Sequence, residues 1–280
     1  MKMRLLAGLI LVLLQTLSVN AYEHFDILNV KNRKIISVEK FVQEAREADI
    51  IIIGEIHDDK RHHDFQLKVI EELNKRGLRL AIAMEMFRQE NQKALDDFII
   101  GKIPLNDFLK AYYENWSAPW KLYSSIFLFA KDKKIPLLGI NIPKEITEKV
   151  AENGFFSLSK KDLEKLPPDV LCDVDDEYVS FIKKIFSLHG KGEKEFKNFC
   201  EAQVLWDKSM AFYVLDYMKS NPGRKVIILT GAVHAGKSAI TAQIKKLNKN
   251  INVLTVIPQI YGRIEPDKIT DKDADYMLYE

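Results

Sequence analysis

Two Gly-x-x-His motifs, each directly after a run of β-branched residues, are the first sign of chemistry in this sequence. The segment IIIIGEIHDD carries Gly54, Glu55 and His57, and the segment LTGAVH carries Gly231 and His234. Each glycine supplies a permissive backbone that lets the following histidine turn back over the end of a strand. Histidine and glutamate together suit either a metal site with nitrogen and oxygen ligands or a general acid–base pair.

Two further apolar runs also end in polar side chains. AIAMEMF carries Glu85, and LLGIN ends in Asn141. Because the carboxyl ends of parallel strands meet at one edge of a sheet, we expect one strand-end cluster made of Glu55, His57, Glu85, Asn141 and His234. Singly, each residue has an ordinary explanation as a capped loop residue or a satisfied carboxylate. Together they favour function, since burying several ionisable groups without mutual pairing is costly.

Residues outside the strand ends are predicted to support this cluster. His62 and His63 lie at the start of the next helix, where they are either exposed in the first turn or directed at the cluster, and His62 shares a helical face with Gln66. In CEAQVLWDKSMAF, Gln203 and Asp207 share one helical face and are expected to contact the cluster from behind. The alternative is a buried hydrogen-bonded pair that only fixes packing.

The apolar runs alternate with helical patterns, which predicts an α/β fold with a mainly parallel central sheet flanked by helices. Two long connections, 88–131 and 160–220, are expected to add a helical subdomain, and 266–280 is expected to be a polar C-terminal tail. The predicted strands are Asp49–Ile53, Arg79–Met84, Ile135–Ile140, Lys225–Thr230 and Ile251–Ile257.

The segment LTGAVHAGKSAI also satisfies the nucleotide-binding pattern G-x-x-x-x-G-K-[ST]. The next predicted strand ends in Pro258 without the acidic residue that would hold a phosphate-bound Mg²⁺. We therefore interpret Gly231 and His234 as the informative residues and the Gly-Lys-Ser as a chance match.

Composition limits the classes of partner. The chain has 280 residues, of which 47% are apolar and 29% charged, with a net charge of +2. It can bury a large core in one or two domains. It shows neither a basic stripe nor a nucleic-acid-binding motif, so binding to nucleic acid has no support.

The first 21 residues are typical of a secretory signal peptide. Lys2 and Arg4 precede an uncharged run from Leu5 to Val19, and small residues stand before a cleavage point after Ala21. The mature domain, 22–265, is therefore expected in the periplasm or cell envelope, while membrane association stays open. In such a compartment Cys172 and Cys200, the only cysteines, allow one disulfide if the fold brings them together.

From about Asp49 to Ile257 the chain resembles the ChaN-like haem-binding family of the Tiki superfamily. The resemblance rests on GEIHDDKRHHDFQ, EMFRQENQ, ENW, GINIPKEI, AQVLWDKSMA and GAVH, in that order and at similar spacing. It implies an α/β domain that binds haem for iron acquisition at the bacterial cell envelope. In this family a tyrosine binds the iron, and haems can stack face to face between two protein copies. The chain departs from the family in lacking a lipidated cysteine and in having Val233 where glycine is frequent.

Tiki-type relatives imply an alternative function. They are metal-dependent proteases that use two GxxH motifs and a glutamate, which correspond here to His57, His234 and either Glu55 or Glu85. The alternative is therefore a metal-dependent hydrolase holding a divalent ion such as Zn²⁺, Mn²⁺ or Co²⁺ at the strand-end cluster.

A ferric porphyrin needs an apolar platform, an iron ligand and cations for its propionates. As a helix, EYVSFIKKIFSLHG would place Tyr178, Ile182, Ile185 and His189 on one face, with Lys184 beside it. The same spacing also suits an ordinary core helix. Tyr113 and Tyr123, which flank Trp116 and Trp120, are the rival haem ligands.

Haem on a surface would leave one porphyrin face in water. Covering so large an apolar area with a second copy is favourable at about 25 cal/mol for each Å². We therefore expect a monomer or weak dimer without haem and a two-fold homodimer with haem bound.

Overall fold

The computed structural model describes residues 24–168, 170, 172–185 and 192–279. The expected signal peptide, 1–21, lies outside the described residues.

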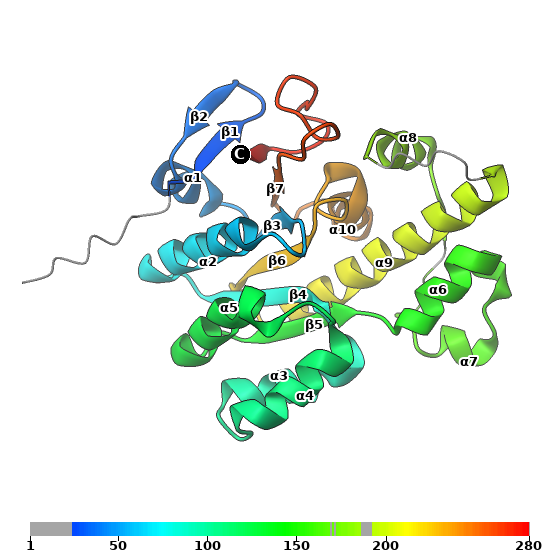
Figure 1. The fold of residues 1–280 in the computed structure, drawn as a ribbon, viewed down its shortest axis with the longest axis horizontal. Helices are drawn as coiled ribbons and strands as arrows, with labels where there is room; N and C mark the ends of the chain where they lie inside the picture. The colour runs from blue at the N-terminus through cyan, green and yellow to red at the C-terminus, as the bar shows by residue number, and fades with distance from the viewer. Residues whose placement is uncertain (1–23, 169, 171, 186–191, 280) are drawn as a thin grey trace, which may run out of the picture.

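An eight-stranded sheet with the order β2-β1-β8-β7-β3-β6-β4-β5 forms the centre of the molecule (Figure 1). The five predicted strands are confirmed, and every pairing among them is parallel. They are β3 (Ile50–Glu55), β4 (Leu80–Arg88), β5 (Leu137–Asn141), β6 (Lys225–Gly231) and β7 (Val253–Pro258). The mainly parallel α/β architecture expected from the sequence is therefore present.

Three further strands extend the sheet beyond β7. They are β1 (Asp26–Asn29), β2 (Lys34–Ile36) and β8 (Tyr276–Tyr279). β8 pairs parallel with β7 and antiparallel with β1. The expectation that 266–280 is only a polar tail is therefore wrong, because Tyr276, Met277 and Leu278 are buried inside the sheet.

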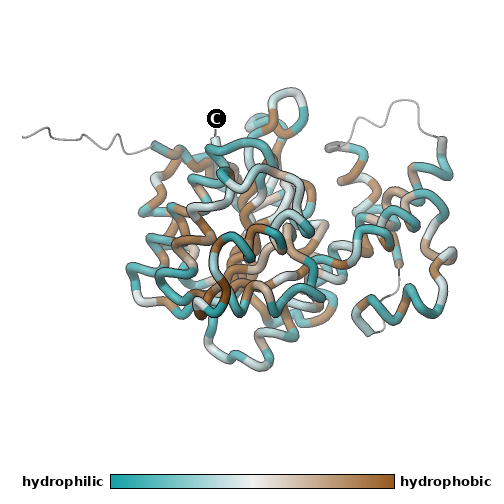
Figure 2. The backbone as a smooth tube through the Cα atoms, turned by 60° about the horizontal axis from the view of Figure 1, so that its bottom comes forward, coloured by the Kyte–Doolittle hydropathy of each residue, from teal (hydrophilic) through white to brown (hydrophobic). Residues whose placement is uncertain are grey.

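Both faces of the sheet are apolar, which explains the unbroken isoleucine run of β3. Ile51 and Ile53 pack on one face, and Ile50 and Ile52 pack on the other. Fully burying a side chain of this size stabilises the fold by roughly 1.5–3 kcal/mol. Figure 2 shows the apolar strands enclosed by helices with hydrophilic outer residues.

The first face is covered by the amino-terminal helices and by the first long connection. These are α1 (Val38–Ala45), α2 (Lys60–Lys75), α3 (Gln92–Ile99), α4 (Leu105–Asn115) and α5 (Trp120–Lys133), with the short turn η1 (Gln89–Asn91). The opposite face is covered by α8 (Asp176–Ile185), α9 (Glu193–Ser220), η3 (Lys237–Thr241) and α10 (Ala242–Leu247).

A helical lobe projects from one end of the sheet (Figure 1). It contains α6 (Lys144–Asn153), η2 (Phe155–Ser157), α7 (Lys160–Leu163) and the amino-terminal part of α9. A small core of its own holds the lobe together, built from Ile142, Ile146, Val150, Leu166, Ala202 and Leu205. In the part of the chain that the structure describes, no helix has both the length and the apolar character needed to cross a membrane.

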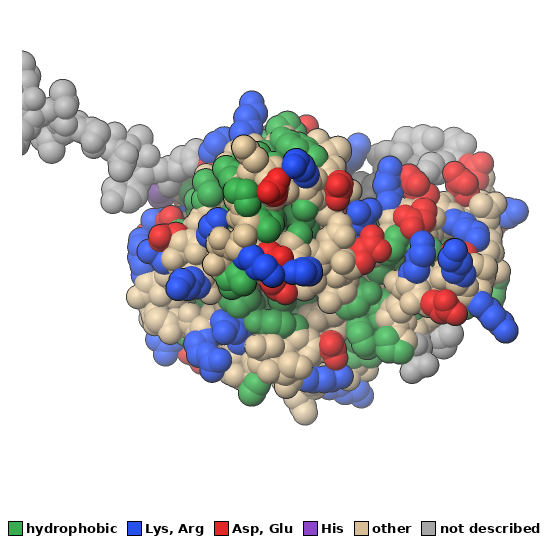
Figure 3. All heavy atoms as spheres, turned by 90° about the horizontal axis from the view of Figure 1, so that it is seen from below, with side chains coloured by type: hydrophobic (Ala, Val, Ile, Leu, Met, Phe, Trp, Pro, Cys, Tyr) green, Lys and Arg blue, Asp and Glu red, His purple; other side chains and the backbone are tan. Residues whose placement is uncertain are grey.

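The nucleotide-binding pattern has a structural use in this fold. The Lys237 Nζ lies 2.5 Å from Asp275 Oδ1 and donates to the Asp271 carbonyl oxygen at 2.8 Å. This lysine therefore anchors the segment that leads into β8. On the molecular face drawn in Figure 3, basic and acidic side chains are interspersed with apolar ones.

Candidate functional site

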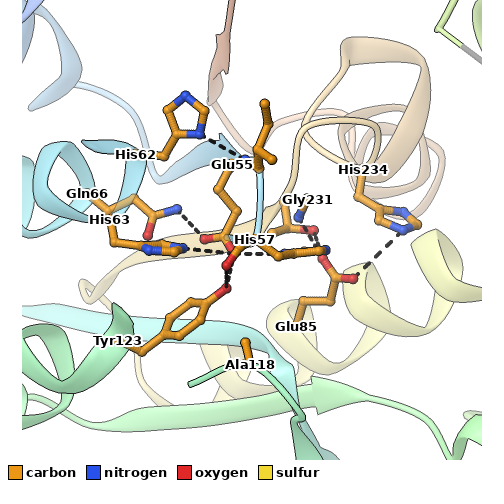
Figure 4. Close-up of polar contacts among 12 residues, drawn as sticks. Glu55, His57, His62, His63, Gln66, Glu85, Ala118, Tyr123, Gly231 and His234 are labelled. Carbon is orange, nitrogen blue, oxygen red and sulfur yellow. Dashed lines mark hydrogen bonds and ion pairs between the residues drawn. The ribbon is translucent and has the colours of Figure 1, made fainter. Parts of the chain in front are cut away.

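The structure brings most of the strand-end cluster together at the carboxyl edge of the sheet (Figure 4). Glu55 ends β3, Glu85 lies near the end of β4, and His234 follows β6. His57 turns back over the end of β3, as its position after Gly54 predicts. Asn141 ends β5 but contacts only backbone: its Nδ2 donates to the Glu85 carbonyl oxygen at 2.7 Å, and its Oδ1 accepts from the Ile142 amide at 2.8 Å.

Glu55 is buried and accepts hydrogen bonds at both carboxylate oxygens. His57 Nδ1 lies 2.8 Å from Oε1, and the Tyr123 hydroxyl donates to the same oxygen. Gln66 Nε2 donates to Oε2 at 2.7 Å, and His63 Nε2 lies 3.4 Å from Oε1. This carboxylate therefore orients the His57 ring through Nδ1, which leaves Nε2 for chemistry.

His234 is held in the same way from the other side of the site. Its Nδ1 lies 2.7 Å from Asp207 Oδ1, and the Tyr178 hydroxyl donates to Asp207 Oδ2 at 2.7 Å. Two chains of tyrosine, carboxylate and histidine thus converge on the sheet edge: Tyr123–Glu55–His57 and Tyr178–Asp207–His234. His57 is the accessible member, with 40% of its side chain exposed against 7% for His234.

Glu85 lies between the two histidines. Its Oε2 accepts hydrogen bonds from the Thr230 hydroxyl and, at 2.7 Å, from the Gly231 amide. Its Oε1 lies 4.0 Å from His234 Nε2. The absence of a side chain at Gly231 permits this arrangement, because a Cβ there would stand 3.2 Å from the His57 ring atoms Cε1 and Nε2.

The two tryptophans nearest the histidines limit their movement. Trp116 packs edge-on against His57 with ring centroids 4.9 Å apart, and Trp206 packs edge-on against His234 at 5.6 Å. Trp116 directly follows α4, and Trp206 lies in α9. Segments that pack on the two faces of the sheet therefore set the site together.

The electrostatics of the site favour charged histidines. Burial alone would raise the pKa of Glu55, but the hydrogen bond from His57 and the nearby His63 ring lower it to about 2. Burial alone would lower the pKa of His234, but the charges of Asp207 and Glu85 raise it to about 9. The pKa of His57 is also raised, because the Glu55 hydrogen bond and the Glu85 charge outweigh its burial. His234 is therefore an imidazolium at neutral pH.

Comparison with known proteins identifies the family. The family model described as haem-binding uptake, Tiki superfamily, ChaN matches residues 41–244, which is most of the chain. The chain belongs to the ChaN family. No curated protein sequence matches it.

Solved structures show the same fold. The chain is similar to ChaN of Campylobacter jejuni, described as binding haem cofacially, with 24% identity, a TM-score of 0.69 and coverage of 92% of this chain and 97% of that one. It is also similar to the type III effector HopBA1, with 12% identity, a TM-score of 0.52 and coverage of 86% and 92%. These likenesses establish a shared fold.

The three tyrosines considered as haem ligands in this ChaN-family chain have very different surroundings. Tyr178 is 2% exposed and Tyr123 is 0% exposed, whereas Tyr113 is 53% exposed. The expectation that Tyr178 and Ile182 form an exposed haem surface is therefore wrong: α8 presents that face to the core beside α9. Lys184 lies in α8, and His189 lies outside the described residues.

Of the supporting residues predicted from the sequence, Asp207, His62 and Gln203, one contacts the cluster directly. Asp207 contacts the cluster directly through His234. His62 instead accepts a hydrogen bond from the Ile56 amide at 2.9 Å and so shapes the turn that carries His57. Gln203 is buried on α9 one turn before Asp207.

The sequence analysis gave no role in the site to Gln66 and Thr230 and left the role of His63 open. Gln66 and His63 contact Glu55, and Thr230 binds Glu85. The helical spacing of His63 and Gln66 was the available signal, since residues three apart share a face.

A divalent metal ion at this site has no support in the geometry. Among the described residues, no group of three or more histidine, cysteine, aspartate or glutamate side chains is arranged to hold a metal ion. The oxygens of Glu55 and Asp207 bind histidine Nδ1 atoms and tyrosine hydroxyls instead.

Proposed function

We propose that this protein binds haem at the surface around Tyr113 and serves haem or iron acquisition after export to the bacterial cell envelope. Membership of the ChaN family supports the ligand. The observation that supports Tyr113 as the ligand is its exposure. A tyrosine oxygen that binds the iron of an external haem must be accessible, and Tyr113 is the exposed residue among the three candidate tyrosines.

The surroundings of Tyr113 suit a porphyrin. Its ring packs edge-on against Tyr112, which packs edge-on against Trp120, with centroids 5.1 Å apart in both pairs. Its hydroxyl oxygen accepts a hydrogen bond from the Trp120 amide at 3.2 Å, which fixes the ring. Lys121 is an exposed cation that could bind a propionate, and Lys110, one turn earlier on α4, is exposed in an ion pair with Asp107 at 2.9 Å.

The Tyr113→Phe variant tests this assignment. It is expected to weaken haemin binding at least about tenfold, equivalent to about 1.4 kcal/mol, because the iron loses its anionic ligand. Absorption titration with haemin measures the affinity and the ligand-dependent spectrum. Tyr261→Phe is the matched control, since Tyr261 is 72% exposed but lies beyond β7. If Tyr113→Phe binds haemin with wild-type affinity, Tyr113 is not the residue that binds the iron. If the wild type shows no saturable haemin binding, the proposed haem function is wrong.

Haem bound at Tyr113 also supports a homodimer. One porphyrin face would remain exposed on a single copy, and pairing two copies removes that apolar area from water. Sedimentation is expected to show a monomer or weak dimer without haemin and a dimer at saturating haemin. A protein that stays monomeric with haemin bound would contradict the pairing.

The export part of the proposal rests on the composition of the first 21 residues. The mature protein is then expected to begin after Ala21. The intact mass of the protein recovered from the periplasmic fraction measures this, and an uncleaved chain confined to the cytoplasm would contradict it.

A second candidate function is favoured by the two histidines with buried carboxylate partners. We propose that the strand-end cluster hydrolyses a neutral carboxylic ester by general acid–base catalysis, without a metal ion in the step. The three carboxylates Glu55, Glu85 and Asp207 outnumber the two imidazoles, so an anionic substrate would be repelled.

Each histidine has a distinct task in this reaction. His57 Nε2 takes a proton from water while the water oxygen bonds to the ester carbonyl carbon. His234 Nε2–H donates its proton to the leaving alcohol as the carbon–oxygen bond breaks. Glu55 and Asp207 hold the two rings in the required orientation through Nδ1.

The decisive assay is turnover of p-nitrophenyl esters by purified protein with and without a chelator. Equal activity in both samples is expected. Activity that vanishes with the chelator and returns with Zn²⁺, Mn²⁺ or Co²⁺ would support the metal-dependent alternative, and no turnover under any of these conditions would remove the hydrolase.

A further inference from the structure

The only two cysteines of the chain lie in the same part of the fold, although 27 residues separate them in sequence. Cys172 precedes α8, and Cys200 lies in α9. The Cys172 thiol donates to the carbonyl oxygen of Glu201, the residue after Cys200, at 3.1 Å. Both cysteines pack into the apolar cluster that also contains Tyr178.

Two ion pairs just after Cys172 hold this segment against its neighbours. Asp173 pairs with Lys208 of α9, and Asp175 Oδ2 lies 3.1 Å from Lys246 Nζ of α10. Asp175 Oδ1 also accepts from the Tyr178 amide at 2.8 Å. The segment after Cys172 is thus tied to α9 and α10, and the Cys172 thiol itself contacts α9 at the turn that carries Cys200.

We propose that Cys172 and Cys200 form one intramolecular disulfide that fastens the start of α8 to α9. Both cysteines are thiols in this structure. Bonding requires the Cys172 sulfur to turn from the Glu201 carbonyl toward Cys200. The disulfide rests on the proposed export in one respect: an oxidising compartment is needed to preserve the bond in the cell.

The low reactivity of the two buried thiols indicates that the disulfide forms during folding, before the thiols are buried. Burial raises the pKa of the Cys172 thiol to about 12 and that of the Cys200 thiol to about 11. Because the thiolate is the attacking species, the folded dithiol reacts slowly at neutral pH. In the unfolded chain one thiolate attacks oxidised glutathione and releases one glutathione thiol. The second cysteine thiolate then attacks the mixed disulfide and releases another, so two protein thiols lose two protons and two electrons.

The bond would constrain the part of the site that α8 supplies. The loop closed by Cys172 and Cys200 contains Tyr178, whose hydroxyl holds Asp207 and through it His234. Closing this loop restricts the unfolded chain and is expected to raise Tm by about 5–10 °C.

Oxidative refolding tests the disulfide independently of export and of haem binding. Full-length protein is unfolded and reduced, then refolded either in a glutathione redox buffer or with excess dithiothreitol. Alkylation and mass analysis after denaturation are expected to find no free thiol in the first sample and two in the second. Peptide mapping should link Cys172 to Cys200 within one chain.

Cys172→Ser and Cys200→Ser are the matched controls, and each should have the same Tm under both conditions. The wild type should melt about 5–10 °C higher when oxidised than when reduced. Two alkylatable thiols after oxidative refolding, a bond between two chains, equal wild-type Tm values or an oxidised chain without native circular dichroism would each overturn the proposal.

Discussion

His57→Ala is expected to lower kcat/KM for a neutral ester by about 10²–10⁴-fold, because the variant lacks the base that removes the water proton. His57 is half-exposed, so the substitution should leave the fold intact, as circular dichroism can verify. His24→Ala is the control, since the His24 side chain is exposed and forms an ion pair with Asp26 outside the site. Activity in His57→Ala within twofold of the wild type would refute the assigned role.

The pH profile of this reaction should be bell-shaped. His57 must be neutral to act as a base, so the rate should rise with pH through the raised pKa of His57. His234 must be protonated to act as an acid, so the rate should fall as pH passes about 9. His234→Gln should abolish this alkaline fall along with most of the activity. A flat profile from pH 6 to pH 10 would contradict both assignments.

Glu55→Leu is expected to lower the free energy of unfolding by about 3–5 kcal/mol, because the buried hydrogen-bond donors around it lose their acceptor. Those donors are Gln66 Nε2, the Tyr123 hydroxyl and His57 Nδ1. Denaturant unfolding measures the change. Glu47→Leu is the matched control, because Glu47 is exposed beside Arg46 and should change stability by less than about 0.5 kcal/mol. A loss below about 1 kcal/mol in Glu55→Leu would show that these donors find other partners.

The same buried groups set how stability depends on pH. Glu55 has a pKa of about 2, below the ordinary value of 4.5, so its contribution is present above pH 4.5 and is lost as pH falls toward 2. His234 has a pKa of about 9, above the ordinary 6.5, so its contribution is full below pH 6.5 and is lost as pH rises through 9. Each contribution is on the order of 3 kcal/mol. Unfolding measured from pH 2 to pH 10 should therefore show greatest stability between about pH 4.5 and 6.5. Stability that does not fall below pH 4.5 would contradict the contribution of Glu55, and stability that does not fall above pH 6.5 would contradict that of His234.

The sequence alone determined the five parallel strands and the edge at which the site lies. An unbroken run such as Ile50–Ile53 buries both faces of a strand, so it predicts an interior parallel strand with little ambiguity. Because such strands end at one edge, the residues after them, Glu55, His57, Glu85 and His234, were predictable as neighbours without knowing the strand order.

Only the tertiary structure decided what those residues bind and which surfaces stay exposed. β8 became an interior strand because β7 and β1 offered unpaired edges, a pairing over long sequence separation that local pattern does not record. The face of α8 with Tyr178 and Ile182 was predictable from helical spacing, but its orientation was not. It depended on packing against α9, where Asp207 accepts a hydrogen bond from the Tyr178 hydroxyl. Periodicity reports which side chains share a face, and the partner that buries that face is chosen by contacts between distant segments.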